Sequence, residues 1–128
     1  MSQYTGYLFV HFTGEQPGGE QIYFSLSRDG MHWEDLNGEE PVLISEIGEK
    51  GARDPFILRN PLNNTYVIIA TDLRIEAGKG WDVAQHAGSR NLIIWQSHNM
   101  TDCEGPVSCE VGIPQAGCVW APEAIFDE

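Results

Sequence analysis

The stretch Gly51-Ala52-Arg53-Asp54-Pro55-Phe56-Ile57-Leu58 decides how the rest of this chain is interpreted. Proline lacks an N–H and has a fixed φ, so Pro55 suits the first residue of a strand better than its middle. The apolar run at 56–58 then predicts a strand that enters a core, with Asp54 at its mouth. An acid in that place can meet a ligand, but the same pattern also fits a turn aspartate bonded to its own backbone.

Runs rich in aromatic and β-branched residues predict strands on both sides of this stretch. They cover residues 7–13, 21–27, 41–44, 53–58, 66–71 and 91–97, with a further segment near 107–111. Turns rich in Gly, Pro and Asn separate several of them, and a long polar loop that contains Trp81 precedes residue 91. Because no segment has a clear helical period, the sequence predicts an all-β chain of short strands.

The strands and turns repeat along the chain. Three pairs of segments match at offsets between 59 and 70 residues: 7–10 with 66–69, 53–55 with 120–122, and 27–34 with 97–104. Four-stranded units repeated in this way are typical of propeller blades, although known periods are shorter, about 40–50 residues. The repeat predicts a single β-propeller domain with part of a blade in 1–50, a complete blade in 51–112 and the start of another in 113–128. Since a closed propeller needs at least about four blades, we expect this chain to be the front part of a longer one.

The composition of the chain disfavours some classes of binding partner and some cellular locations. Seven basic and nineteen acidic side chains give a net charge of −12, which disfavours nucleic acid and anionic membrane surfaces as partners. No window approaches the ~18 apolar residues of a membrane span, and the first residues lack the pattern of a secretory signal. The three cysteines have no C-x-x-C spacing and predict free thiols in a reducing compartment. We therefore expect a cytoplasmic protein of bacterial type.

Three motifs of the chain resemble those of glycoside hydrolase family 43, whose members are five-bladed propellers. The motifs are Arg53-Asp54-Pro55, the Ser-x-Asp-Gly-x-x-Trp turn at 27–33, and Val119-Trp120-Ala121-Pro122-Glu123. The resemblance implies an inverting hydrolase of arabinofuranosyl or xylosyl linkages in plant polysaccharides or oligosaccharides. It also implies that Asp54 is the general base, and that the general acid and the aspartate that tunes its pKa lie in later blades. The expected partners are an arabinose- or xylose-containing oligosaccharide and the remaining C-terminal blades, without which the fragment is expected to be inactive and to self-associate.

Five further residues form the predicted substrate-binding set: Arg53, Asp72, Trp81, Trp120 and Glu123. Aromatic faces bury a large area with defined geometry, so the two tryptophans suit sugar platforms, with packing between blades or a hydrophobic plug as the alternatives. Asp72 is expected to bond sugar hydroxyls, or else to be a solvated loop acid. Arg53 would lower the pKa of Asp54 if its side chain turned inward, but neighbouring side chains on a strand point to opposite faces. The lone histidines predict no metal ligand and no cofactor, although some relatives hold a calcium ion in the channel.

Glu104-Gly105-Pro106 copies the motif that carries the general acid in this family. The repeat places Glu104 opposite Glu34, after the third strand and near the outer edge of its blade. A glutamate at the outer edge cannot reach the central channel, so Glu104 is expected to be structural.

Two other functions remain open. A chain complete at this length would favour a non-catalytic carbohydrate-binding or scaffold piece of a propeller. A related five-bladed furanosidase, such as the fructan-cleaving enzymes, uses an Arg-Asp-Pro aspartate to stabilise the transition state. That class also needs a nucleophilic aspartate in an Asn-Asp-Pro-like motif upstream, and none stands before Arg53.

Overall fold

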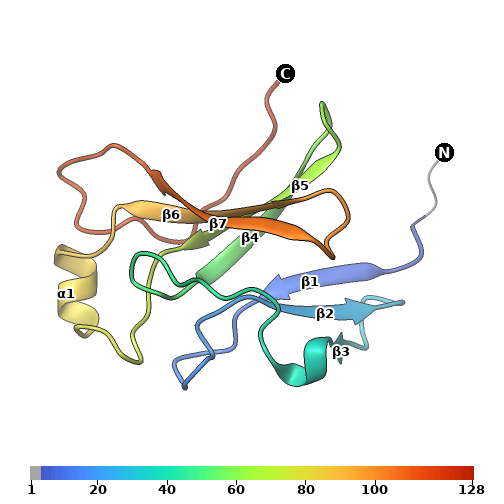
Figure 1. The fold of residues 1–128 in the computed structure, drawn as a ribbon, viewed down its shortest axis with the longest axis horizontal. Helices are drawn as coiled ribbons and strands as arrows, with labels where there is room; N and C mark the ends of the chain where they lie inside the picture. Colours follow the sequence, from blue (N-terminus) through green and yellow to red (C-terminus); the bar gives the residue numbers. More distant parts are fainter. Residues whose placement is uncertain (1–3) are drawn as a thin grey trace.

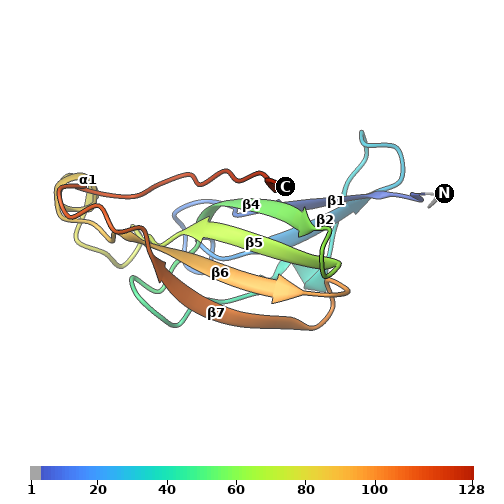
Figure 2. The ribbon, with the colours of Figure 1, turned by 90° about the horizontal axis from the view of Figure 1, so that it is seen from above.

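Residues 4–128 are described by a computed structural model of the chain, which contains two antiparallel sheets (Figures 1 and 2). The first sheet has the order β1-β2-β3, and the second has the order β4-β5-β6-β7. The strands are β1 (Tyr7–His11), β2 (Tyr23–Ser27), β3 (Glu34–Asp35), β4 (Arg53–Asn60), β5 (Thr65–Thr71), β6 (Asn91–Ser97) and β7 (Cys103–Glu110). The helical elements are the 3₁₀ turn η1 (Asn37–Glu39) and the short helix α1 (Trp81–His86). The all-β prediction is confirmed, whereas the number of blades and the division of the chain into blades stay predictions.

The four strands predicted within 51–112 form one sheet, although the last of them, predicted near 107–111, spans Cys103–Glu110, and residues 7–13 and 21–27 lie in a separate sheet as predicted. Two details of the prediction were wrong. Residues 41–44 were predicted to be a strand and to complete the blade in 1–50, but they contribute only the isolated bridge between Leu43 and Ile22. The third strand of the first sheet is β3, because the turn after Ser27 brings Asp35 back beside Ser25. The loop before β6 contains α1, whose six residues are too few to give a helical period in the sequence.

The two sheets repeat the same pairing of strands. Tyr7 pairs with Ser27 in the first sheet, and the matching residues Tyr66 and Ser97 pair in the second. The outer strands keep this register, since Leu26 pairs with Glu34 and Gln96 pairs with Glu104. Both copies therefore hold equivalent residues at equivalent places, which a chance similarity of sequence would not produce.

The turns after the matching strands are also built alike. The hydroxyl of Ser27 accepts the N–H of Gly30 at 2.8 Å, and that of Ser97 accepts the N–H of Met100 at 2.8 Å. Asp29 and Asn99 each accept two further backbone N–H groups of their own turns. Gly30 and Met100 both have positive φ, of 77° and 60°, so the second turn keeps a left-handed residue without a glycine.

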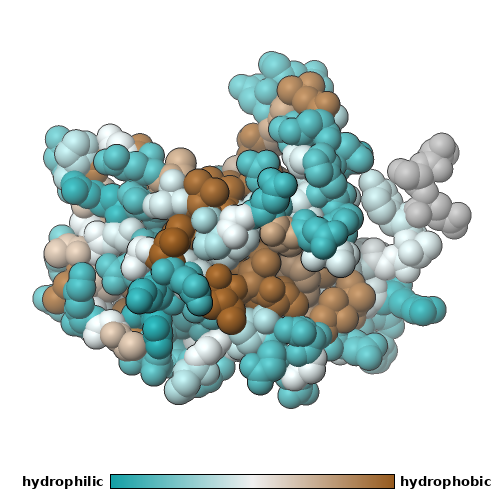
Figure 3. Space-filling model, in the orientation of Figure 1, coloured by the Kyte–Doolittle hydropathy of each residue, from teal (hydrophilic) through white to brown (hydrophobic). Residues whose placement is uncertain are grey.

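One apolar core lies between the two sheets. Its buried members are Val10, Ile22, Phe24, Ala52, Ile68, Ala70, Ile93 and Trp95. Because side chains alternate between the faces of a strand, Val10 and Phe24 face this core while Tyr7 and Phe9 point to the other face of the first sheet. On that face the rings of Phe9 and His11 stack with centroids 4.6 Å apart, and Trp33 lies next to Phe9. The first sheet therefore exposes aromatic side chains on that face. In the space-filling view, hydrophobic residues gather in the middle of the molecule, where β1 and β2 run in Figure 1 (Figure 3).

Within residues 4–128, no helix has the length and apolar character needed to cross a membrane. The three cysteines, Cys103, Cys109 and Cys118, are unpaired.

Candidate active site

Several segments meet at the end of the second sheet where β4 begins. Arg53, the first residue of β4, pairs with Thr71, the last residue of β5. The hydroxyl of Thr71 accepts the N–H of Ala121 at 2.8 Å, which fastens the C-terminal segment to this end of the sheet. The N–H of Ala52 donates to the carbonyl of Glu20 at 2.8 Å, which fastens the loop between β1 and β2 to it. The repeated Ser-x-Asp/Asn turns lie at the ends of β2 and β6, at the opposite end of the strands.

Asp54 is exposed at this end and has an unusual backbone conformation. Its φ is 47°, a left-handed value that few residues other than glycine adopt, although aspartate tolerates it better than most. The pairing shifts between Arg53 and Phe56, so β4 carries one residue more than β5 across this interval. A bulge of this kind redirects a side chain out of the regular alternation of the strand. The fold therefore presents the Asp54 carboxylate to solvent at the mouth of β4.

The matching motif in the C-terminal segment has the same conformation. Ala121 stands between Trp120 and Pro122, as Asp54 stands between Arg53 and Pro55, and its φ is 49°. The left-handed residue before proline is thus a property of the repeated motif, and it occurs with or without a carboxylate. What distinguishes the first copy is the acid itself.

The side chain of Arg53 turns toward the first sheet and is only 12% exposed. Its Nη1 lies 3.0 Å from Oε2 of Glu20 and 3.4 Å from Oε1 of Glu15. Its guanidinium also lies 4.9 Å from the ring centre of Phe12 and 5.1 Å from that of Trp81. Glu20 is therefore the carboxylate that neutralises Arg53 most directly. The contact of Arg53 with substrate stays a prediction.

Trp81 and Trp120 are brought together although they are distant in the sequence. Trp81 is the first residue of α1, and its ring meets that of Trp120 edge to face, with centroids 6.0 Å apart and an interplanar angle of 80°. The ring of Trp81 remains 41% exposed, and Trp120 is partly buried. The guanidinium of Arg53 ties this aromatic pair to the start of β4, and partly exposed aromatic rings suit contact with a sugar ring.

Asp72, a predicted sugar-binding residue, lies inside the fold and is 4% exposed. Its Oδ1 accepts the N–H of Glu49 at 2.8 Å, and its Oδ2 accepts the hydroxyl of Ser89 at 2.6 Å. Burial raises the pKa of the Asp72 carboxyl, because the charged form loses its hydration. The carboxylate therefore joins two loops at the mouth, and its contact with sugar stays a prediction. Glu123, the last member of the predicted set, is exposed at the end of the motif that contains Trp120.

Glu104 lies on β7, the edge strand of the second sheet, opposite Gln96. The predicted position at the outer edge is confirmed, and β5 and β6 separate Glu104 from the strand of Asp54.

Two residues that contact Arg53, Glu20 and Phe12, were not predicted from the sequence. Glu20 follows Pro17-Gly18-Gly19 and looks like an ordinary polar residue at the end of a turn, yet it is 2% exposed. A single sequence holds no signal for this burial, because the groups that bond the carboxylate are far away in the chain.

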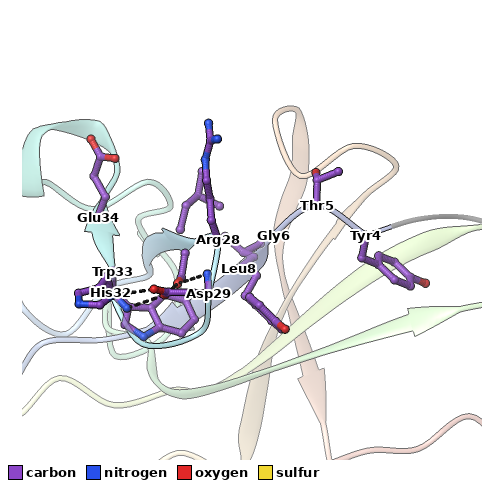
Figure 4. A pocket seen from close by; sticks show the side chains of 12 residues that line it. Tyr4, Thr5, Gly6, Leu8, Arg28, Asp29, His32, Trp33 and Glu34 are labelled. Atoms are coloured by element: carbon purple, nitrogen blue, oxygen red, sulfur yellow. Dashed lines mark hydrogen bonds and ion pairs between the residues drawn. The ribbon is translucent and has the colours of Figure 1, made fainter.

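A hollow of about 820 Å³ lies away from Asp54. Its walls come from residues 4–8, the end of β2 and the turn that follows. Figure 4 shows Asp29 bonded to His32 beside Trp33, while Glu34 points away from them. Hydrogen bonds from His32 hold the pKa of Asp29 well below its usual value. The hydrogen bonds of the Asp29 carboxylate are thus made within its own turn.

Within residues 4–128, no group of three or more His, Cys, Asp or Glu side chains is placed to hold a metal ion.

Comparison with known proteins places these features in a family. A family model described as "Probable glycosyl hydrolase domain" matches residues 2–128. The chain is 33% identical over 131 residues to an alpha-L-arabinofuranosidase of Bifidobacterium longum subsp. longum, in an alignment that covers 97% of this chain. The same alignment covers 12% of that relative, so the chain spans about one eighth of its length. No solved structure matches the chain.

Proposed function

This chain belongs to the probable glycosyl hydrolase domain family related to glycoside hydrolase family 43, and we propose that it forms the N-terminal part of an inverting glycoside hydrolase. Its substrates are arabinofuranosyl or xylosyl linkages of plant polysaccharides or oligosaccharides. The matched protein of Bifidobacterium longum subsp. longum is an alpha-L-arabinofuranosidase, which favours the arabinofuranosyl linkage.

The presentation of Asp54 is the observation that carries this proposal. A general base must be reachable by water and fixed in direction, and Asp54 is exposed on a bulge with a left-handed φ of 47°. In an inverting reaction one carboxylate takes a proton from water while an acid on the far side of the sugar protonates the leaving oxygen. The two carboxyls stand about 6.5–9.5 Å apart in such sites. We assign the base to Asp54 and expect the acid in a later part of the polypeptide.

The aromatic pair Trp81 and Trp120 is proposed to bind the sugar. Trp81 has exposed ring surface and Trp120 supports it from the side. A pentose ring stacked on Trp81 would lie next to the mouth of β4, where the base activates water. Glu123 is proposed to contact substrate hydroxyls from the C-terminal segment.

The remaining blades are the proposed partner of this chain. The first sheet has three strands where the second has four, and the neighbour missing on the free edge of β1 corresponds to β4. Later segments of the same polypeptide would complete this sheet and cover its aromatic face.

The proposal is tested with the polypeptide that contains this chain, using aryl α-L-arabinofuranoside and aryl β-xyloside. Time-resolved proton NMR should show release of the inverted anomer, and the Asp54→Asn variant should lose the activity. Initial release of the retained anomer would refute the inverting mechanism. Absence of hydrolysis of both substrates would favour the non-catalytic carbohydrate-binding alternative.

A further inference from the structure

Glu20 is a buried carboxylate whose bonding partners all come from distant segments. Its side chain is 2% exposed, and its Oε1 accepts the N–H of Glu76 at 2.8 Å. Its Oε2 accepts the N–H of Ile75 at 2.8 Å and lies 3.0 Å from Nη1 of Arg53. A buried carboxylate requires compensation for its lost hydration, and here two backbone donors and one cation supply it. The loop between β1 and β2 is thereby joined to the start of β4 and to the loop that leads to α1.

Arg53 extends this network to the aromatic pair. Its guanidinium lies between the rings of Phe12 and Trp81, at 4.9 and 5.1 Å from their centres. Cations placed over aromatic faces at such distances are attracted to the rings, and the planar guanidinium suits stacking better than an ammonium group. Trp81 in turn meets Trp120. Arg53 also immediately precedes Asp54 at the bulge. The contacts of its side chain therefore fix the backbone next to Asp54.

We propose that Glu20 is a positioning residue of the candidate active site, which fixes Trp81 and the mouth of β4 through Arg53 and through the backbone of Ile75 and Glu76. The inference rests on the proposed function, since the role assigned to Trp81 is sugar binding. Glu20 touches no substrate in this arrangement. It acts by holding the platform and the base in one geometry.

Glu15 offers a matched control. Its carboxylate also faces Arg53, at 3.4 Å, but its side chain is 45% exposed. An exposed ion pair contributes little, because both charges keep much of their hydration and salt screens them. Glu20→Gln removes the charge and leaves Arg53 without its buried partner, whereas Glu15→Gln leaves the buried network intact.

The kinetic test uses the full polypeptide with aryl α-L-arabinofuranoside. We expect Glu20→Gln to lower kcat/KM by about 10- to 100-fold, the effect of a displacement of about 1 Å at a catalytic site, and Glu15→Gln to leave it unchanged. In the background of Trp81→Ala, Glu20→Gln should have a much smaller effect, because residues that act through one another are not additive. Equal effects with and without Trp81, or an unchanged kcat/KM in Glu20→Gln, would overturn the proposal.

Limited trypsin digestion gives a readout that does not depend on activity. Arg74 and Lys79 lie in the loop fastened by Glu20, so Glu20→Gln should accelerate cleavage after these residues, and Glu15→Gln should not. If the wild-type polypeptide hydrolyses neither sugar, the proposed function fails while the digestion still decides whether Glu20 holds the loop. Unchanged cleavage in Glu20→Gln would overturn the inference.

If Glu20→Gln does not fold, Arg53→Lys replaces it in the kinetic test. This variant retains the positive charge but loses the stacking of the guanidinium on Trp81. It should lower kcat/KM only when Trp81 is present.

Discussion

Replacement of Asp54 by Asn, Ala and Gly separates its chemistry from its conformation. All three variants should lower kcat on an aryl α-L-arabinofuranoside by at least about 10²-fold, the usual minimum for loss of a positioned general base. Asparagine retains the size and hydrogen bonding of the side chain but cannot take a proton from water. The acidic limb of the kcat/KM profile should therefore disappear in Asp54→Asn, while substrate binding should survive.

The stabilities of the three variants should differ, because φ at this position is 47°. A left-handed conformation costs an ordinary L-residue about 1–2 kcal/mol, whereas asparagine tolerates it through local hydrogen bonds and glycine adopts it freely. Asp54→Ala should therefore be about 1 kcal/mol less stable than Asp54→Asn. Asp54→Gly should be at least as stable as Asp54→Asn, since relief of strain offsets the roughly 0.4–1 kcal/mol by which glycine favours the unfolded chain.

Steady-state kinetics and urea unfolding of the full polypeptide measure these two effects. Glu104→Gln is the control, and it should keep both wild-type activity and wild-type stability because Glu104 is exposed on the edge strand. An active Asp54→Asn would refute the assignment of the base. Equal stability of Asp54→Ala and Asp54→Asn would refute the argument from the left-handed backbone, whatever the kinetics show.

Three further predictions concern the surroundings of the site. Thr71→Val removes the acceptor of the Ala121 N–H and should destabilise the protein by about 1–3 kcal/mol in urea unfolding, and an unchanged free energy of unfolding would contradict this. Because burial raises the pKa of Asp72, this carboxyl favours folding below its unfolded pKa of 3.8, and that contribution is lost as the pH rises through the folded pKa. Asp72→Asn should therefore gain stability relative to wild type as the pH rises through this range, and a pH-independent difference in unfolding free energy would contradict the prediction. The isolated chain should self-associate through the aromatic face of the first sheet, and Phe9→Ser should weaken the association in sedimentation velocity, whereas a wild-type monomer at all concentrations would contradict it.

The sheets could be predicted from the sequence because their signals are local. Alternating apolar residues and Ser-x-Asp turns indicate a pair of strands without reference to the rest of the chain, and the repeat indicated which segments correspond in the two sheets. The outer strand β3 escaped prediction because Glu34 and Asp35 are exposed and have no β-branched or apolar character. What fixes β3 is tertiary: the Ser25 hydroxyl donates to Asp35 at 2.6 Å.

The candidate site could be predicted only in part for a similar reason. Asp54 and the tryptophans belong to short motifs, so the sequence marked them as candidates. The edge-to-face contact of Trp81 with Trp120 and the ion pair of Arg53 with Glu20 join residues more than 30 positions apart. Such contacts depend on how loops fold over the end of the sheet, which periodicity does not describe.

The two copies of the repeat differ in length at one place. The offset between matching strands is 59 residues at β1 and β5 but 70 residues at β2 and β6, so the paired residues Tyr66 and Ser97 are eleven positions further apart in the chain than the paired residues Tyr7 and Ser27. The longer loop carries α1 and Trp81, and the short loop of the first copy supplies the glutamate that binds the backbone of the longer one. The shorter loop thus braces the longer one, which carries a helix and a tryptophan that the first copy lacks. Insertions at this loop in related chains should vary the sugar that fits, without changing the register of either sheet.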